Sequence, residues 1–434
     1  MTVSLGIAFS MISVYPLLSA ACASGRSTHL KSSRATAPLP AMASDVVMEW
    51  NQQAVELTLL PASALAPIQQ TRVMAIFQLA VHDAINGITG EYETYLSPSS
   101  APENASPEAA AIAAAHHALK NLIPGNDALL DDRYTSSLAV HGLSPADPGI
   151  TFGQSSAAAV LLVRANDHSS QTQFDYNAPG VGAPGVWVRL NNAPALLPGW
   201  GNVTPFVIRG KSQFRPNPPP ALDSERYAKD YNEIKEIGIA AGSSRSFEQT
   251  QIATFWRASP TAIWNPVLTQ VVGTRNLNLS DKARLFALFY LAAADSSIAC
   301  WEAKYTYNFW RPQPAIRNGD LDGNDFTASD GSWLPFVNTP PHPEYPSGHT
   351  TNSSAMAKIL ISEFEDNPGM QIVVTQSGIT RRWNTFSEAI QEVIDARVYS
   401  GIHFRNSDEV GARMGRQIAQ FVSNHALRKS SKSR

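Results

Sequence analysis

The first residues that could do chemistry form a cluster that begins at Lys304 and ends at Arg311 and Pro312. A seven-residue offset makes about two helical turns, so Lys304 and Arg311 are predicted to share one helix face, and Pro312 helps to end that helix. Aromatic residues crowd the same stretch. We therefore expect the two cations to lie away from open solvent as a candidate anion site, with a pair of ordinary surface charges as an equal alternative.

The second cluster, Pro346-Ser347-Gly348-His349, precedes a predicted helix. Ser347 suits the N-cap position, and Gly348 allows the backbone N–H to approach a ligand closely. A helix N-terminus also offers unpaired donors and a positive dipole end to an anion. Alone, the cluster is more typical of a capped helix with an unrelated histidine in its first turn.

The third cluster runs from Arg397 to His403. One straight helix would place these two residues about 120° apart, but Gly401 offers a break after which His403 can turn back. Together the clusters supply three cations, a Ser/Gly helix start and two histidines, and they contain no carboxylate. This combination predicts a site for a compact, highly charged tetrahedral oxyanion.

The chain resembles the vanadium-dependent haloperoxidases in the order of these residues. It also resembles the acid phosphatases of the type-2 phosphatidic acid phosphatase superfamily, which share that anion site. The motifs that carry the resemblance lie within residues 301–408 and are Lys304-x6-Arg311-Pro312, Pro346-Ser347-Gly348-His349 and Arg397-x5-His403. The resemblance implies vanadate as the cofactor, with hydrogen peroxide, a halide and a small organic acceptor as reactants.

The cradle that the resemblance implies has donors around the vanadate oxygens and one nitrogen on the metal. Its expected donors are Lys304, Arg311, Arg397, Ser347 and the Gly348 N–H.

The same resemblance implies roles for the two histidines. His403 is the implied axial ligand of the metal, and His349 is the implied acid/base group for the peroxide protons. In the phosphatase alternative, His403 attacks phosphorus to form a phosphohistidine, and His349 protonates the leaving group.

Three further residues refine the resemblance. Family members often carry an Asp four residues after the axial histidine; here Ser407 holds that position, so Asp408 is the expected partner of the histidine. His342, seven residues before the acid/base histidine, resembles the algal bromoperoxidases and favours bromide or iodide over chloride, although it is equally typical of a neutral loop histidine. Trp301 is expected to wall the halide side, with ordinary core packing as the alternative.

The elements that must position these residues are predicted to be helices, and no strand pattern of comparable strength occurs. The predicted fold class is all-α, with two four-helix bundles packed into one large unit. Long Pro/Gly-rich loops at 170–222 and 313–345 are expected to have functional roles. The expected helices are 69–88, 106–123, 128–140, 154–166, 224–241, 248–257, 261–277, 281 to about 310, 347–365, 387–399 and 407–424.

Composition limits the partners of the chain. It has 434 residues, of which 44% are apolar and 16% are charged, and its net charge is -3. Such a balance excludes broad electrostatic capture of nucleic acid or of an anionic membrane. Any anion must be held by a few well-placed cations. The composition leaves open whether the chain forms a homo-oligomer. The two cysteines are too few for a disulfide scaffold or a cysteine-rich metal site.

The N-terminal residues are typical of a processing segment. Residues 1–23 are expected to be a signal peptide, 24–44 a flexible linker, and 45–434 one haloperoxidase/acid phosphatase-like helical domain. Export makes the predicted location secreted or periplasmic, and Cys22 weakly resembles a lipoprotein anchor. No other run reaches 18 apolar residues, so no membrane span is expected in the mature form.

Overall fold

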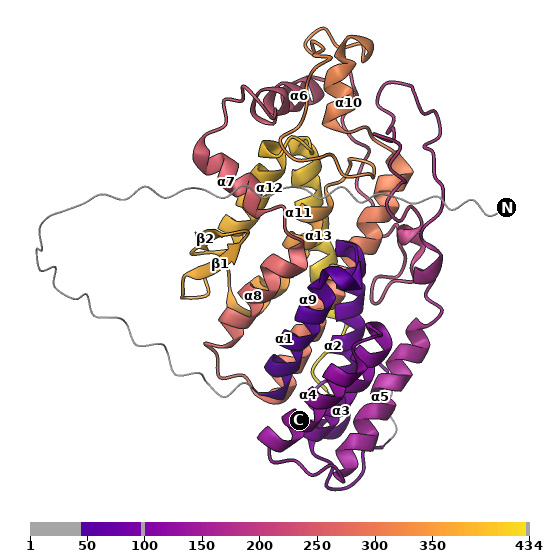
Figure 1. Cartoon of the computed structure of the whole chain (residues 1–434), viewed down its shortest axis with the longest axis vertical. Coiled ribbons are helices and arrows are strands. Elements are labelled where there is room, and N and C mark those ends of the chain that lie inside the picture. The colour runs from indigo at the N-terminus through magenta and orange to yellow at the C-terminus, as the bar shows by residue number, and fades with distance from the viewer. Residues whose placement is uncertain (1–44, 97–99, 431–434) are drawn as a thin grey trace, which may run out of the picture. The chain divides into compact units, whose positions relative to one another are not determined.

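The computed structural model describes residues 45–96 and 100–430. The expected signal peptide, the linker and Cys22 therefore lie outside the described residues. The described part is mostly helical, which confirms the predicted fold class of helical bundles (Figure 1). Its helices are α1 (Val46–Leu59), α2 (Pro67–Thr89), α3 (Pro107–Leu122), α4 (Asp127–Val140), α5 (Pro148–Arg164), α6 (Glu225–Ile237), α7 (Phe247–Phe255), α8 (Pro260–Val272), α9 (Leu279–Tyr307), α10 (Pro312–Arg317), α11 (Gly348–Phe364), α12 (Phe386–Tyr399) and α13 (Arg405–His425).

Local capping explains several of the helix ends. Ser106 accepts a hydrogen bond from the Ala109 N–H at 3.1 Å, and Pro107 occupies the first helical position, so α3 begins as its sequence predicts. Helix α1 and the short helix α10 were not expected. A small antiparallel hairpin, β1 (Ile372–Gln376) and β2 (Ile379–Trp383), was also missed, with Ile372 paired to Trp383 at its open end.

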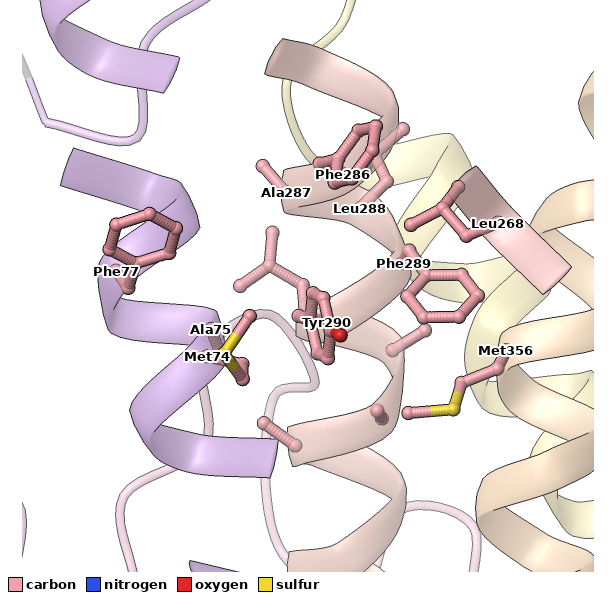
Figure 2. Packing of buried hydrophobic residues seen from close by; sticks show 14 of the residues in the cluster. Met74, Ala75, Phe77, Leu268, Phe286, Ala287, Leu288, Phe289, Tyr290 and Met356 are labelled. Atoms are coloured by element: carbon pink, nitrogen blue, oxygen red, sulfur yellow. The ribbon is translucent and has the colours of Figure 1, made fainter. Parts of the chain in front are cut away.

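Helix α9 is the structural centre of the described residues. It packs against α2 of the N-terminal helices and against α11 and α13 of the C-terminal helices. Figure 2 shows Phe77 of α2 on one side of α9 and Met356 of α11 on the other. Both groups of helices therefore share one continuous apolar core, and α9 belongs to both.

The burial of α9 distinguishes a core helix from a membrane-spanning helix. Every residue from Leu285 to Lys304 is buried. Within the described residues, α9 is the one helix that is long and apolar enough to cross a membrane, but 94% of its most apolar window is buried inside the protein. We therefore interpret α9 as a core helix.

The end of α9 differs from the expectation. The helix was expected to continue to about Trp310, but it ends at Tyr307, and Asn308 takes a left-handed conformation with φ 49°. The backbone then leaves the helix to pair with the long loop: Trp187 N–H donates to Asn308 O at 2.7 Å, and Trp310 N–H donates to Gly185 O at 3.0 Å. Tertiary pairing thus overrides the helical pattern, and Arg311 is not on the helix that carries Lys304.

The long loop at 170–222 is attached to α9 by a buried carboxylate. Asp295 accepts hydrogen bonds from three successive backbone N–H groups, those of Phe206, Val207 and Ile208, at 2.6 to 2.9 Å. Burial raises the pKa of Asp295 to about 6, and the three donors oppose that rise. The loop is therefore fixed against the helix that carries Lys304.

Candidate oxyanion site

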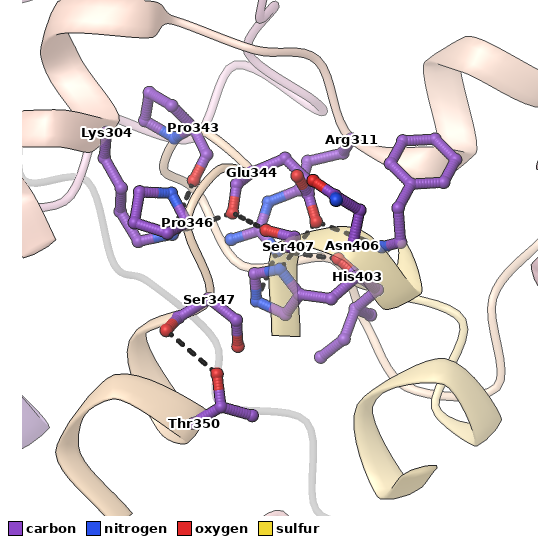
Figure 3. A network of polar contacts seen from close by, with 12 residues as sticks. Lys304, Arg311, Pro343, Glu344, Pro346, Ser347, Thr350, His403, Asn406 and Ser407 are labelled. Carbon is purple, nitrogen blue, oxygen red and sulfur yellow. Dashed lines mark hydrogen bonds and ion pairs between the residues drawn. The ribbon is translucent and has the colours of Figure 1, made fainter. Parts of the chain in front are cut away.

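Lys304 lies in the last turn of α9 and is completely buried. Its ammonium group donates to the carbonyl oxygens of Pro343 and Glu344 at 3.0 and 2.9 Å, which holds the 313–345 loop against α9 (Figure 3). Burial lowers the pKa of Lys304 to about 7, because the charged form loses its hydration. A third donor on the same nitrogen is left for another acceptor.

Arg311 is the residue before α10 and reaches into the same region. Its Nε donates to the carbonyl oxygen of His342 at 2.8 Å, and its Nη1 donates to that of Ile402 at 2.8 Å. Burial lowers its pKa to about 10. Because Lys304 and Arg311 both bind the 342–344 segment, that segment brings them together although they lie on different helices.

Arg397 enters from the C-terminal end of α12. It is buried, and its Nη1 donates to the carbonyl oxygen of Trp256 at 2.7 Å. Its Nε is also buried but has no hydrogen-bond partner in the protein. Burial lowers the pKa of Arg397, and the nearby carboxylate of Asp408 opposes that shift. The group therefore has a donor available for a bound anion.

The break that turns His403 back occurs at the expected glycine. Helix α12 ends at Tyr399, and Gly401 has φ +77°, a conformation that favours glycine. A Cβ atom there would lie 2.4 Å from the carbonyl oxygen of Gly238, so no larger residue fits. The chain can thus reverse, and His403 becomes buried beside Arg311.

The hydrogen bonds of His403 fix its tautomer. Its Nε2 lies 3.1 Å from Nη1 of Arg311, and its Nδ1 lies 2.8 Å from Oε1 of Glu344. Since a guanidinium group can only donate, Nε2 must accept and Nδ1 must carry the proton. Burial and, as the second cause, the positive charge of Arg311 hold the pKa of His403 well below its usual value. The ring is therefore neutral, with its lone pair on Nε2.

Ser347 and Gly348 form the start of α11. Ser347 occupies the N-cap position as predicted, but its side chain makes no capping bond, and its buried Oγ has no hydrogen-bond partner in the protein. A Cβ atom on Gly348 would lie 3.2 Å from the Trp301 ring, which is a tight contact. The absence of a side chain at Gly348 therefore allows the helix start to lie close against α9.

His349 is half-buried in the first turn of α11. Its Nε2 lies 3.2 Å from the carbonyl oxygen of Ala258, so Nε2 carries the proton and Nδ1 has the lone pair. Burial, followed by the positive charge of Arg397, holds the pKa of His349 well below its usual value. The neutral ring can accept a proton at Nδ1.

Trp301 and His342 lie against each other with ring centroids 4.9 Å apart. The Trp301 indole N–H donates to Leu196 of the long loop at 3.2 Å, and the ring also lies 5.7 Å from the Lys304 ammonium group. Nη2 of Arg311 donates to the His342 ring and lies 2.9 Å from its Nδ1 and 3.3 Å from its Nε2. The pair forms one aromatic wall beside the cations.

The donors left without a protein partner suit an oxyanion. Ser347 Oγ and Arg397 Nε are both buried and unpaired, beside the Lys304 ammonium group and the Arg311 guanidinium group. Burying a donor without a partner is unfavourable, so such atoms indicate a ligand with acceptor oxygens. Within 45–96 and 100–430, no group of three or more His, Cys, Asp or Glu side chains could hold a bare metal ion. The residues therefore fit a tetrahedral oxyanion, with one neutral nitrogen available to its central atom.

The comparisons with known proteins agree with this geometry. A family model for the VCPO second helical-bundle domain matches residues 284–432. The vanadium chloroperoxidase of Curvularia inaequalis is 23% identical over 83% of this chain and 78% of its own length. The structure of a bacterial vanadium-dependent iodoperoxidase aligns with a TM-score of 0.77 and 25% identity, covering 89% of this chain and 97% of that one.

A bacterial vanadium-dependent chloroperoxidase, solved in its apo form, shares the fold with a TM-score of 0.65. It is 18% identical, and the alignment covers 83% of this chain and 94% of that one. The chain is therefore similar to the vanadium haloperoxidases over most of its length.

Glu344 is a site residue that the sequence reasoning missed. Its carboxylate is completely buried and accepts from His403 Nδ1 and from the Phe404 N–H at 3.0 Å. Burial raises its pKa to about 7, while Arg311 and Lys304 oppose the rise. The three sequence clusters contain no carboxylate, yet the folded site does, because Glu344 lies between the first two clusters. The one available signal was an acidic residue inside the motif His342-Pro-Glu-Tyr-Pro-Ser-Gly-His349.

Asp408 occupies a different place from the one expected. Glu344 takes the contact with His403 that Asp408 was expected to make, because Asp408 lies in the first turn of α13. The Ser347 hydroxyl and then Arg397 act to lower the pKa of its carboxyl group, and Glu344 acts to raise it, but by hydrogen-bond geometry neither carboxylate oxygen has a partner among the described residues. Burial raises the pKa of Asp408 well above its usual value.

Proposed function

We propose that this protein is a vanadate-dependent haloperoxidase that uses hydrogen peroxide to oxidise iodide or bromide. The product would be hypohalous acid, which halogenates a small organic acceptor. The observation that carries the proposal is the Nε2 lone pair of His403, held neutral among the buried cations Lys304, Arg311 and Arg397. A neutral nitrogen surrounded by fixed positive charge would suit an oxyanion whose central atom accepts one nitrogen ligand.

The residues present fit vanadate. His403 Nε2 would bind the metal, and Lys304, Arg311 and Arg397 would donate to the oxygens. Ser347 Oγ would complete the donor set, because it has no partner in the protein. Bound vanadate supplies Lewis acidity that activates peroxide without a change of oxidation state.

His349 is positioned for proton transfer beside this cradle. Its Nε2–H is engaged by the Ala258 carbonyl oxygen, which orients the ring and leaves Nδ1 as the proton-accepting atom. A neutral imidazole can take a proton from incoming peroxide and return it later in the cycle. We assign His349 this acid/base role.

The choice of halide rests on the aromatic wall. His342 packs against Trp301 and accepts from Arg311, so it places a polarisable ring and a neutral nitrogen beside the cradle. Iodide and bromide are larger and softer than chloride and suit such a wall. The likeness to the iodoperoxidase structure supports the same choice.

The test is to reconstitute the apoprotein with orthovanadate and add peroxide. Halide oxidation is followed as triiodide formation with iodide and as monochlorodimedone bromination with bromide. We expect both reactions to require vanadate, and chloride to be the poorest substrate. Rapid hydrolysis of p-nitrophenyl phosphate without any vanadate-dependent halogenation would instead establish the phosphatase alternative.

A further inference from the structure

A second cavity lies outside the oxyanion site, between α13 and the loop segment 213–220. This groove has a volume of about 1110 Å³. Lys358 of α11 contributes to its lining, and Tyr345 lies at its inner side. We call it the α13 groove. Its volume is at the upper end of the range that small organic ligands occupy, which is roughly 300–1,000 Å³.

The loop segment 213–220, which forms one wall of the α13 groove, is held in place by contacts with neighbouring side chains. Arg215 forms an ion pair with Glu302 of α9, with Nε 3.0 Å from Oε2. The Tyr307 hydroxyl donates to the carbonyl oxygen of Pro216, and the Tyr345 hydroxyl donates to that of Asn217 at 2.7 Å. Prolines in the same segment restrict its backbone. The wall is therefore preformed, which lowers the ordering cost of binding.

The charged side chains that line the α13 groove are all basic. Arg413 and Arg416 of α13 and Lys358 line it, and none of the three forms an ion pair within the described residues. No Asp or Glu belongs to the lining. The acidic residue nearest in sequence, Glu409, binds Arg226 at 2.9 Å. Because residues three apart share a helix face, the two guanidinium groups repel each other unless an anion neutralises them.

The other end of the α13 groove is aromatic. The Phe214 and Phe421 rings meet edge to face with centroids 5.7 Å apart, and His425 stacks on Phe421 at 3.9 Å. Phe421 follows Arg413 by eight residues on α13, which corresponds to about 12 Å of helix rise. Positive charge and aromatic surface are thus separated by about the length of a two-ring organic molecule.

We infer that the α13 groove binds a small organic anion with an aromatic body. Its carboxylate or sulfonate would lie on Arg413 and Arg416, and its rings would lie against Phe214 and Phe421. Guanidinium groups bind such planar or trigonal anions with two parallel hydrogen bonds. This site is separate from the oxyanion site and does not depend on the proposed catalytic activity.

The test is calorimetric titration of the vanadate-reconstituted protein with naphthalene-2-sulfonate and with its neutral analogue, naphthalene-2-sulfonamide. We expect the sulfonate to bind at least about tenfold more tightly, a difference of about 1.4 kcal/mol. Arg413→Gln with Arg416→Gln should remove that difference, and Arg413→Lys with Arg416→Lys should retain most of it. Lys229→Gln on α6, an exposed cation outside the groove, is the matched control and should change nothing.

Three outcomes would overturn the inference. Equal affinity for sulfonate and sulfonamide would show that charge does not contribute. Loss of naphthalene-2-sulfonate binding when vanadate occupies the oxyanion site would place the ligand there instead. Binding of an octaglutamate peptide, with no binding of the sulfonate, would make the groove a protein-docking surface. Halide oxidation by both double variants should equal that of the parent protein, which also verifies that they are folded.

Discussion

His403 donates its Nδ1–H to Oε1 of Glu344 across 2.8 Å, and both side chains are buried. This single contact fixes the imidazole ring in one orientation and in one tautomer. It also makes Nε2 the atom with the lone pair, which accepts from Nη1 of Arg311 at 3.1 Å. Glu344 is therefore a positioning residue for the nitrogen that we propose would bind vanadate.

Glu344→Ala should weaken vanadate binding about 10- to 100-fold, the usual effect of losing the partner of a metal-binding histidine. Glu344→Gln should weaken it less, because the amide oxygen can still accept from Nδ1. Equilibrium dialysis gives the affinities, and the ⁵¹V NMR shift of the bound vanadate reports the altered ligand. Glu409→Ala, which removes a partly exposed carboxylate on α13, is the control. Unchanged affinity and an unchanged NMR shift in Glu344→Ala would contradict the positioning role.

His403→Ala and His349→Ala should separate binding from turnover. The first variant loses the nitrogen proposed to bind vanadium, so it should lose vanadate binding. The second keeps the cradle but lacks the proton-accepting Nδ1, so it should retain vanadate and lose about 10²- to 10⁴-fold in halide oxidation. Vanadate affinity and steady-state rates are both measured. Retained vanadate affinity in His403→Ala would rule out the ligand assignment.

Ser347→Ala should affect ligand binding without affecting stability. Ser347 Oγ is buried and unpaired, so its removal should change the unfolding free energy by less than about 0.5 kcal/mol. A lost hydrogen bond to a charged ligand costs about 1.5–3 kcal/mol, so vanadate affinity should fall about 10- to 100-fold. Ser296→Ala provides the opposite case, because that hydroxyl donates to Asn352 at 2.6 Å. It should lose about 1 kcal/mol of stability and keep its vanadate affinity. Equal vanadate affinity in Ser347→Ala and the parent would exclude the hydroxyl from the cradle.

The stability of the protein should fall in acid because His82 is buried. Burial lowers the pKa of His82 to about 3, and its Nε2 has no hydrogen-bond partner. The folded state thus binds the proton more weakly than the unfolded state, so stability is full above pH 6.5 and declines as the pH falls towards 3. Between pH 7.5 and 5.0 the loss from His82 is about 2 kcal/mol.

Urea denaturation at these two pH values measures the effect. His82→Leu should reduce the pH dependence by about that amount. Identical pH dependence in His82→Leu and the parent protein would show that His82 does not contribute.

The local features of this fold could be predicted from sequence. The α3 cap at Ser106, the break at Gly401 and the helix after Ser347 each follow from the conformational preferences of a few neighbouring residues. The hairpin was missed although Ser377 and Gly378, both with positive φ, form its two-residue turn. A Ser-Gly pair between two short runs rich in β-branched residues is a sequence signal for such a hairpin.

The contacts between distant residues could not be predicted in the same way. Glu344 and His403 are 59 residues apart, and only the packing of the 313–345 loop on Lys304 brings them together. The end of α9 depends on pairing with Gly185 and Trp187, more than 100 residues earlier. Spacing rules describe one helix at a time, so they placed Arg311 on α9, and the family resemblance placed Asp408 beside His403.

Because α9 is shared between the two groups of helices, the C-terminal region is not an independent folding unit. A fragment that begins at residue 284, where the family match starts, would cut into α9 and expose the side that packs on α2. Chemical or thermal melting should therefore proceed as one cooperative transition across the described residues. Efforts to miniaturise the catalyst would need to keep the N-terminal helices, even though none of the proposed cradle residues lies in them.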